Sequence, residues 1–144
     1  MAYGERNSWA ALVASAISIA VYLAIVAPQI GSRPVGEIEW SWPMLWTILG
    51  GLALSIAASI AWGLLVHRSD PQAEHVEDVR DVDISRLGER VGQAFLTIGL
   101  VAVLLMCAAR MDWFWIANAA YLGFALSAVA DCLTRVIVYR AGMP

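Results

Sequence analysis

Two groups of residues in this sequence carry side chains that could do chemistry. The first is a row at every fourth position of a long apolar segment, formed by Gly123, Ser127, Asp131 and Arg135. An ionisable residue in such a segment is a functional candidate by default, because a charge is costly there. The second is a charged segment, residues 68–90, which holds four of the nine arginines and seven of the twelve acidic residues. Both groups adjoin apolar stretches, so their surroundings decide what they can do.

The depth of Asp131 in its segment decides how this carboxylate is interpreted. Counted from Phe114 at ~1.5 Å per helical residue, Asp131 lies roughly 26 Å along the segment. A bilayer core is ~30 Å thick, so Asp131 is expected near one edge and not at the midplane. Arg135 lies one turn further on and can pair with it. Two interpretations stay open: a charge pair that anchors the helix end, or a carboxylate that couples to proton or cation movement.

The rest of the chain is far more apolar than a soluble domain. Apolar residues make up 60% and charged residues 15%, against roughly 45–50% and about 25% in soluble domains. Four apolar segments have about the length that a helix needs to cross a bilayer, which is roughly 20 residues. They are residues 9–27, 44–66, 91–109 and 114–138. Because backbone groups in lipid must be satisfied internally, we expect helices. The sequence therefore predicts an all-α integral membrane four-helix bundle, a single domain over residues 1–144, made of two transmembrane hairpins joined by a charged cytoplasmic loop at residues 67–86.

The arginines predict the orientation of these segments. If both termini are cytoplasmic, seven of the nine arginines lie on the cytoplasmic side, and Arg33 and Arg110 lie outside. This distribution follows the positive-inside rule. The absence of lysine and the abundance of alanine indicate a GC-rich bacterial genome, which predicts a multi-pass protein of the bacterial inner membrane. An aromatic belt is expected at the outer boundary, where five tryptophans cluster: Trp40, Trp42, Trp46, Trp113 and Trp115.

Small residues at four-residue spacing predict where helices approach one another closely. Such residues form one stripe on a helix, and a second helix can pack against it. The stripes predict either the seams of the bundle itself or an interface between two copies. The predicted packing residues are Gly51, Ser55, Ser59 and Gly63 in the second segment, Gly88 and Gly92 at the start of the third, and Gly123 and Ser127 in the fourth.

Other residues give no support to enzymatic chemistry. His67 and His75 are the only histidines, and both lie in the loop at residues 67–86. A metal site formed by His75 with Glu74, Glu77 and Asp78 would have no recognised ligand spacing. Cys107 and Cys132 are expected near opposite membrane faces, too far apart for a disulfide. The net charge of −3 does not indicate a nucleic-acid partner. We therefore expect no enzyme activity, no catalytic residues, no metal and no cofactor.

The second half of the charged segment has the pattern of a helix start. Asp83, Arg86 and Glu89 recur at three-residue spacing with alternating charge, which stabilises a helix. Acidic residues are favourable at the positive end of the helix dipole. The third helix is therefore expected to begin near Asp81 or Asp83, before its apolar part.

This helix start also carries a family resemblance. The run Asp78-Val79-Arg80-Asp81, followed by Ile84, Gly88 and Arg90, resembles the D-E-R-D-x-x-I signature of small bacterial and archaeal membrane proteins of unknown function. Val79 stands where that pattern usually has glutamate. The runs at residues 114–118 and 139–142 are also similar to that group, so the resemblance covers residues 78–142. It implies a shared architecture and a cytoplasmic motif, and it assigns no catalytic residue.

The motif has two interpretations. It either marks the membrane boundary, or it is a docking surface in which Asp78, Arg80, Asp81 and Asp83 pair with another protein. The expected function is an accessory, regulatory or assembly role exerted through the charged loop, with the lipid bilayer and a membrane protein or a second copy as partners. The alternative is a small oligomeric transporter or channel that uses Asp131.

Overall fold

The computed structural model describes residues 3–69 and 79–141, and within these ranges the chain forms four long helices. They are α1 (Tyr3–Val26), α2 (Ser41–Ser69), α3 (Val79–Ala108) and α4 (Trp113–Ala141). All four are long and apolar enough to cross a membrane. The predicted all-α four-helix fold is therefore confirmed, and the helices indicate a multi-pass membrane protein.

Two helices extend into the predicted charged loop at residues 67–86, one from each side. Helix α2 continues through Ser69, and α3 already begins at Val79, shortly before the expected start at Asp81. The early start of α3 has a tertiary cause: Ile84 and Gly88 are both buried. This packing stabilises the helix beyond the apolar part of its sequence, as packing of one helix face commonly does.

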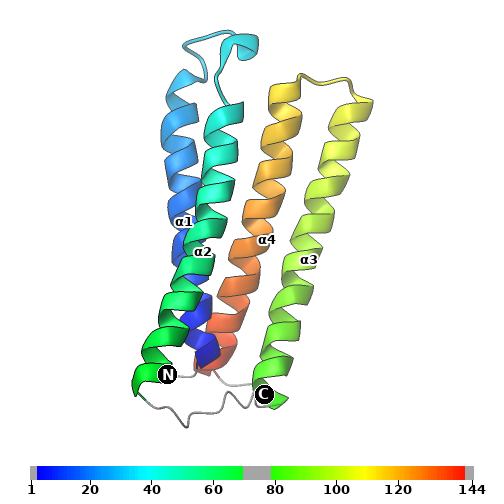
Figure 1. Cartoon of the computed structure of the whole chain (residues 1–144). Helices are drawn as coiled ribbons and strands as arrows, with labels where there is room; N and C mark the ends of the chain where they lie inside the picture. The colour runs from blue at the N-terminus through cyan, green and yellow to red at the C-terminus, as the bar shows by residue number, and fades with distance from the viewer. Residues whose placement is uncertain (1–2, 70–78, 142–144) are drawn as a thin grey trace.

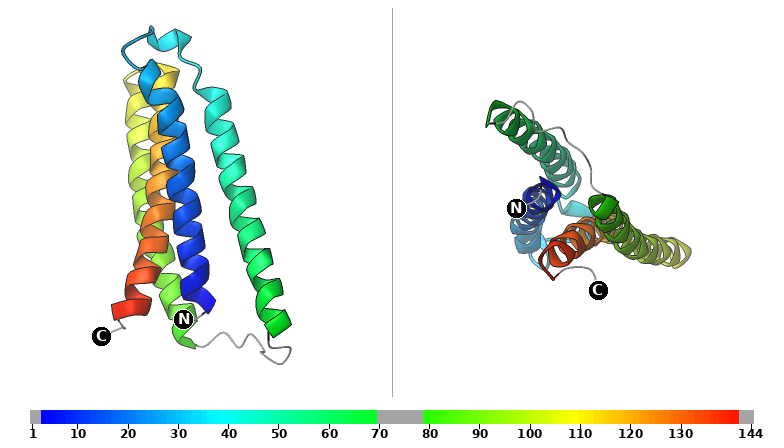
Figure 2. Two further views of the ribbon diagram at one scale, coloured as in Figure 1. Left: turned by 90° about the vertical axis from the view of Figure 1, so that its left-hand side faces the viewer. Right: turned by 90° about the horizontal axis from the view of Figure 1, so that it is seen from below.

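The helices form two antiparallel hairpins, α1–α2 and α3–α4, which stand side by side (Figure 1). Helix α4 packs along α3 and also contacts α1, whereas α2 packs chiefly on α1. Figure 2 shows the resulting order α2, α1, α4, α3, with α2 standing apart from the other three helices. The described ends of α1 and α4 lie at the same end of the bundle.

The two connections at the opposite end differ in length: residues 27–40 join α1 to α2, and residues 109–112 join α3 to α4. Two 3-10 turns, Ala27–Gln29 and Val35–Glu37, join α1 to α2. Between α3 and α4, the Asp112 carboxylate accepts a hydrogen bond from the Phe114 backbone N–H at 2.9 Å. This contact caps the first turn of α4, whose leading N–H groups have no partner inside the helix. Tyr22, Val26, Ile38 and Phe114 form a buried cluster beneath these connections.

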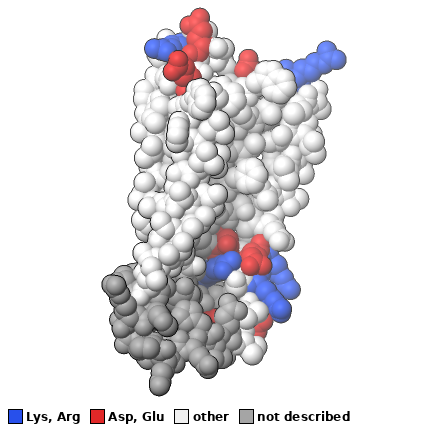
Figure 3. Space-filling view, in the orientation of Figure 1, with Lys and Arg blue, Asp and Glu red and all other residues white. Residues whose placement is uncertain are grey.

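Most large apolar side chains point away from the bundle. Leu104 and Leu105 in α3 expose 68% and 66% of their surface. Figure 3 shows an uncharged band with charged groups gathered at its two ends. Trp42, Trp46 and Trp113 are 69%, 69% and 80% exposed at the end where the connections lie. An apolar band of this kind suits contact with lipid, and exposed tryptophans suit its edge.

Candidate functional site

The seam between α3 and α4 is built on glycines. A Cβ atom added to Gly99 would lie 2.7 Å from the Cα atom of Gly123, so the two backbones touch at this crossing. Near the charged end, a Cβ on Gly92 would lie 3.0 Å from the backbone oxygen of Ser127. Small residues permit this approach between helices in lipid. The structure thus brings together the packing residues Gly92, Gly123 and Ser127.

Gly99 was missed in the sequence analysis, although a signal for it was present. It follows Gly92 by seven residues, two helical turns, and therefore lies on nearly the same face of α3. The predicted stripes have four-residue spacing, which does not include Gly99. A seven-residue spacing is also typical of residues that face a partner helix.

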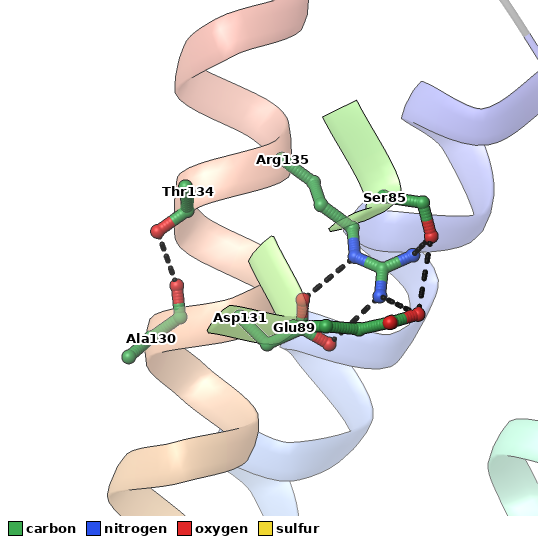
Figure 4. Close-up of polar contacts among 6 residues, drawn as sticks. All are labelled: Ser85, Glu89, Ala130, Asp131, Thr134 and Arg135. Carbon is green, nitrogen blue, oxygen red and sulfur yellow. Dashed lines mark hydrogen bonds and ion pairs between the residues drawn. The ribbon is translucent and has the colours of Figure 1, made fainter. Parts of the chain in front are cut away.

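The polar centre of this seam is a cluster of four side chains from α3 and α4, here called the Arg135 cluster: Ser85, Glu89, Asp131 and Arg135 (Figure 4). Arg135 Nε donates to Asp131 Oδ1 at 2.7 Å, and its Nη2 donates to Asp131 Oδ2 at 3.1 Å. Its Nη1 donates to the Ser85 hydroxyl at 2.8 Å, and Nη2 lies 3.6 Å from Glu89 Oε1. One guanidinium therefore joins two carboxylates and a hydroxyl across the two helices.

The fork of the guanidinium suits this arrangement. The Arg135 and Asp131 side chains are 23% and 27% exposed, so the pair is largely shielded from solvent by protein. Two parallel N–H donors match the two oxygens of a carboxylate, which strengthens such a pair and orients it. Gly88 makes room for it, because a Cβ at that position would lie 2.8 Å from Arg135 Cγ. The packing glycine and the predicted charge pair thus belong to one structural unit.

The start of α3 is held to the end of α4 by a second polar contact. The Tyr139 hydroxyl donates to Asp81 Oδ1 at 3.0 Å. Arg80 and Asp83 beside it are exposed, whereas Asp81 is only partly exposed. Asp78, the remaining candidate docking residue, lies outside the described residues. Of the docking candidates that are described, Asp81 is therefore engaged within the chain, and Arg80 and Asp83 face outward.

The predicted stripe of α2 lies on the α1 side of that helix. A Cβ on Gly51 would lie 2.5 Å from the Ser18 hydroxyl oxygen of α1. The Ser59 hydroxyl donates to Asn7 Oδ1 at 2.9 Å. Ser55 lines a cavity between α1, α2 and α4. Gly63 belongs to α2, in a stretch where side chains are outside the described set.

Helices α1 and α4 are tied at both ends. Tyr22 donates its hydroxyl to Asn118 Oδ1 at 2.5 Å, a hydrogen bond between helices of the kind that polar residues form in membrane bundles. Asn118 in turn donates from Nδ2 to the Phe114 carbonyl at 2.7 Å. At the other end, the Arg140 guanidinium lies 5.2 Å from the centre of the Trp9 ring, within the range of a cation–π contact. These contacts join the two hairpins.

The two cysteines are not members of this cluster, although Cys132 directly follows Asp131 in the chain. Cys107 is exposed in α3, Cys132 is buried in α4, and both are free thiols. Among residues 3–69 and 79–141, no group of three or more histidine, cysteine or acidic side chains could hold a metal ion. The Arg135 cluster itself orients α3 against α4 and presents the exposed carboxylate of Glu89.

Protein families, curated proteins and solved structures were all searched, and none matches this chain.

Proposed function

We propose that this chain is an integral protein of the bacterial cytoplasmic membrane with both termini in the cytosol. We propose further that it has an accessory, regulatory or assembly role and docks a membrane-protein partner through the start of α3. The observation that carries the docking proposal is the exposed pair Arg80 and Asp83 on a helix start that two polar contacts hold in place. The orientation is supported by the distribution of the arginines.

The fixed position of the helix start favours recognition. The Tyr139–Asp81 hydrogen bond and the Arg135–Ser85 hydrogen bond attach this part of α3 to α4. A surface that is ordered before binding loses less conformational entropy when the partner arrives. Charged groups at the rim of an interface contribute mainly specificity and orientation. Oppositely charged side chains at Arg80 and Asp83 suit a partner that carries the complementary pair.

The D-E-R-D-x-x-I resemblance is compatible with this proposal. Asp81 and Ile84, two residues of the motif, have roles within the fold: Asp81 accepts the bond from Tyr139, and Ile84 is buried. Arg80 and Arg90, two other residues of the motif, are exposed. We infer that the motif combines a structural part, which fixes the helix start, with an outward part, which recognises the partner.

A transport role that uses Asp131 is the second candidate. The observation in its favour is a cavity of about 190 Å³ beside Asp131, lined also by Glu89 and Gln93. Against it, both carboxylate oxygens of Asp131 accept hydrogen bonds from Arg135. A carboxylate held in this way is a poor carrier, because the guanidinium competes with any incoming cation. Loss of an ion-driven flux in proteoliposomes on Asp131→Asn substitution would favour transport over docking.

The docking proposal is tested by reversing the two outward charges. The double variant Arg80→Glu/Asp83→Arg keeps the net charge and leaves Asp81 in place. Affinity purification from native membranes in mild detergent is expected to recover a stoichiometric partner with the wild type and to lose it with this variant. The matched control is Arg33→Glu/Glu37→Arg, a reversal of two exposed residues at the opposite end. If both variants recover the same proteins as the wild type, the docking proposal is wrong.

A further inference from the structure

The first turns of α3 direct most of their acids and their arginines to different sides of the helix. Asp81 accepts a hydrogen bond from α4 at 3.0 Å, and Glu89 lies 3.6 Å from the Arg135 guanidinium of α4. Arg86 and Arg90 are exposed, and among the residues that the structure describes neither is part of an ion pair. Figure 3 shows basic groups at the edge of the bundle at this end. Unpaired positive charge is therefore presented on the outward side of α3.

Arg86 and Arg90 form one row on that side. Each lies two residues after a residue that is buried, Ile84 or Gly88, and two residues are more than half a helical turn. The two arginines are four residues apart, so they are neighbours on the helix surface, where like charges repel. Asp83 lies one turn before Arg86 and is exposed, yet no ion pair joins these two described residues. An anion between the two guanidinium groups would relieve their repulsion.

The depth of the two arginines is that of lipid phosphates. Arg90 directly precedes the apolar segment at residues 91–109, so it lies where the hydrocarbon core ends. The head-group layer adds roughly 5–8 Å on each side of a ~30 Å core, and Arg86 lies one turn, ~6 Å, farther out. Both guanidinium groups therefore lie within that layer. Arg80 is about 15 Å from Arg90 along the helix, beyond the layer, where a protein partner can reach it.

The row of arginines continues into the apolar band. Ala94 and Ile98 follow Arg90 at four-residue spacing, both are exposed, and Ile98 is 66% exposed. An acyl chain can lie along this surface while the head group remains at the arginines. The planar guanidinium binds phosphate oxygens through two parallel N–H groups, and such charge-assisted bonds are about twice as strong as neutral ones. The row therefore offers both halves of a phospholipid a matching surface.

We propose that Arg86 and Arg90 bind the head group of an anionic phospholipid in preference to a zwitterionic one. The two guanidinium groups hold its phosphate, and its acyl chain runs along Ala94 and Ile98. A zwitterionic head group brings an ammonium of its own, which the two arginines repel. Lipid phosphates are already present at this depth, whereas an acidic side chain of a protein would have to enter the head-group layer. This inference rests on the proposed membrane placement and does not involve the charges assigned to docking.

The proposal is tested by the lipids that the protein retains. Full-length protein is equilibrated in bilayer nanodiscs with equal amounts of phosphatidylglycerol and phosphatidylethanolamine of the same acyl chains, then released into mild detergent and weighed by native mass spectrometry. The wild type is expected to retain phosphatidylglycerol in preference to phosphatidylethanolamine. In Arg86→Gln/Arg90→Gln this preference is expected to fall about fivefold for each arginine, equivalent to about 1 kcal/mol each. Both positions are exposed, so the variant is expected to fold.

Two control variants separate the arginine pair from the net charge of the chain. Arg33→Gln/Arg110→Gln removes the same charge from two exposed positions at the opposite end and is expected to keep the preference. Arg86→Lys/Arg90→Lys keeps the positive charge at the site and is expected to keep most of the preference.

The lipid site and the docking surface fail independently. The docking variant Arg80→Glu/Asp83→Arg is expected to keep the preference for phosphatidylglycerol. Conversely, Arg86→Gln/Arg90→Gln is expected to recover the same protein partner as the wild type in affinity purification.

Three results would overturn the lipid proposal. The first is equal retention of the two lipids by the wild type. The second is an equal fall in preference in Arg33→Gln/Arg110→Gln, which would make the effect one of net charge. The third is loss of the protein partner in Arg86→Gln/Arg90→Gln with an unchanged lipid preference, which would assign the two arginines to an acidic protein surface.

Discussion

The contact between Gly99 and Gly123 predicts opposite effects of the same substitution at two glycines. Alanine at position 99 would place its Cβ 2.7 Å from the Cα of Gly123, whereas a Cβ at Gly50 meets nothing within 4 Å. The neighbour at Gly99 is backbone, which cannot rotate away. Helices α3 and α4 must therefore move apart by about 0.7 Å before the new Cβ reaches ordinary van der Waals distance from Gly123. A gap of this size removes about a quarter to a half of the van der Waals attraction between the neighbouring atoms.

The expected change in the free energy of unfolding follows from two opposing effects. Overpacking a tight site costs about 1–3 kcal/mol. Replacing a helical glycine by alanine recovers roughly 0.5–1 kcal/mol of backbone entropy. Gly99→Ala is therefore expected to lower the free energy of unfolding by about 1 kcal/mol, and Gly50→Ala to raise it by up to about 1 kcal/mol. A larger residue at position 99, such as valine, should destabilise the protein further.

Reversible unfolding in mixed detergent micelles, followed by circular dichroism, measures this difference. Both variants are compared with the wild type at equal detergent composition, because micelle composition alters the unfolding midpoint. The expected order of stability is Gly50→Ala, wild type, Gly99→Ala. If Gly99→Ala is as stable as Gly50→Ala, α3 and α4 do not touch at this crossing and the reasoning is refuted.

Three further predictions use the same unfolding assay. Arg135→Met should lower the free energy of unfolding by about 2 kcal/mol, which is less than the ~3–5 kcal/mol lost when a fully buried ion pair is broken, because both side chains are about a quarter exposed. The double variant Arg135→Met/Asp131→Leu should restore most of this loss, since no unpaired carboxylate remains at position 131. If the double variant shows no recovery, the pairing is contradicted. Tyr22→Phe removes the hydrogen bond to Asn118 and should cost about 1 kcal/mol, whereas an unchanged midpoint would argue against that bond. Asp112→Ala removes the contact to the Phe114 N–H and should cost about 1 kcal/mol, and Asp112→Asn should recover most of it.

The sequence predicted the helices well because the length of an apolar segment is a direct physical requirement of the bilayer. It predicted their ends less well, since the start of α3 depends on the burial of Ile84 against another helix. The Asp131–Arg135 pair was expected because its four-residue spacing is local to one helix. The participation of Ser85 and Glu89 was not expected, because these residues come from a helix whose rotation about its axis is set by packing.

The pattern of small residues also did not predict which helices are neighbours. A stripe of small residues predicts a close approach, but it does not say which helix approaches. Gly51 faces Ser18 of α1, and Gly123 faces Gly99 of α3, although both stripes have similar composition. The contact between Tyr22 and Asn118, which joins the two hairpins, depends on residues 96 positions apart and has no local signal.

The pairing of the helices has a consequence for cooperativity. Because α2 packs chiefly on α1 and α3 packs along α4, the two hairpins are joined mainly where α1 contacts α4. Local opening is expected where fewest buried contacts must break. The hairpins should therefore separate from one another at a lower free energy than global unfolding, and the Tyr22–Asn118 hydrogen bond should be lost before the contacts between α3 and α4.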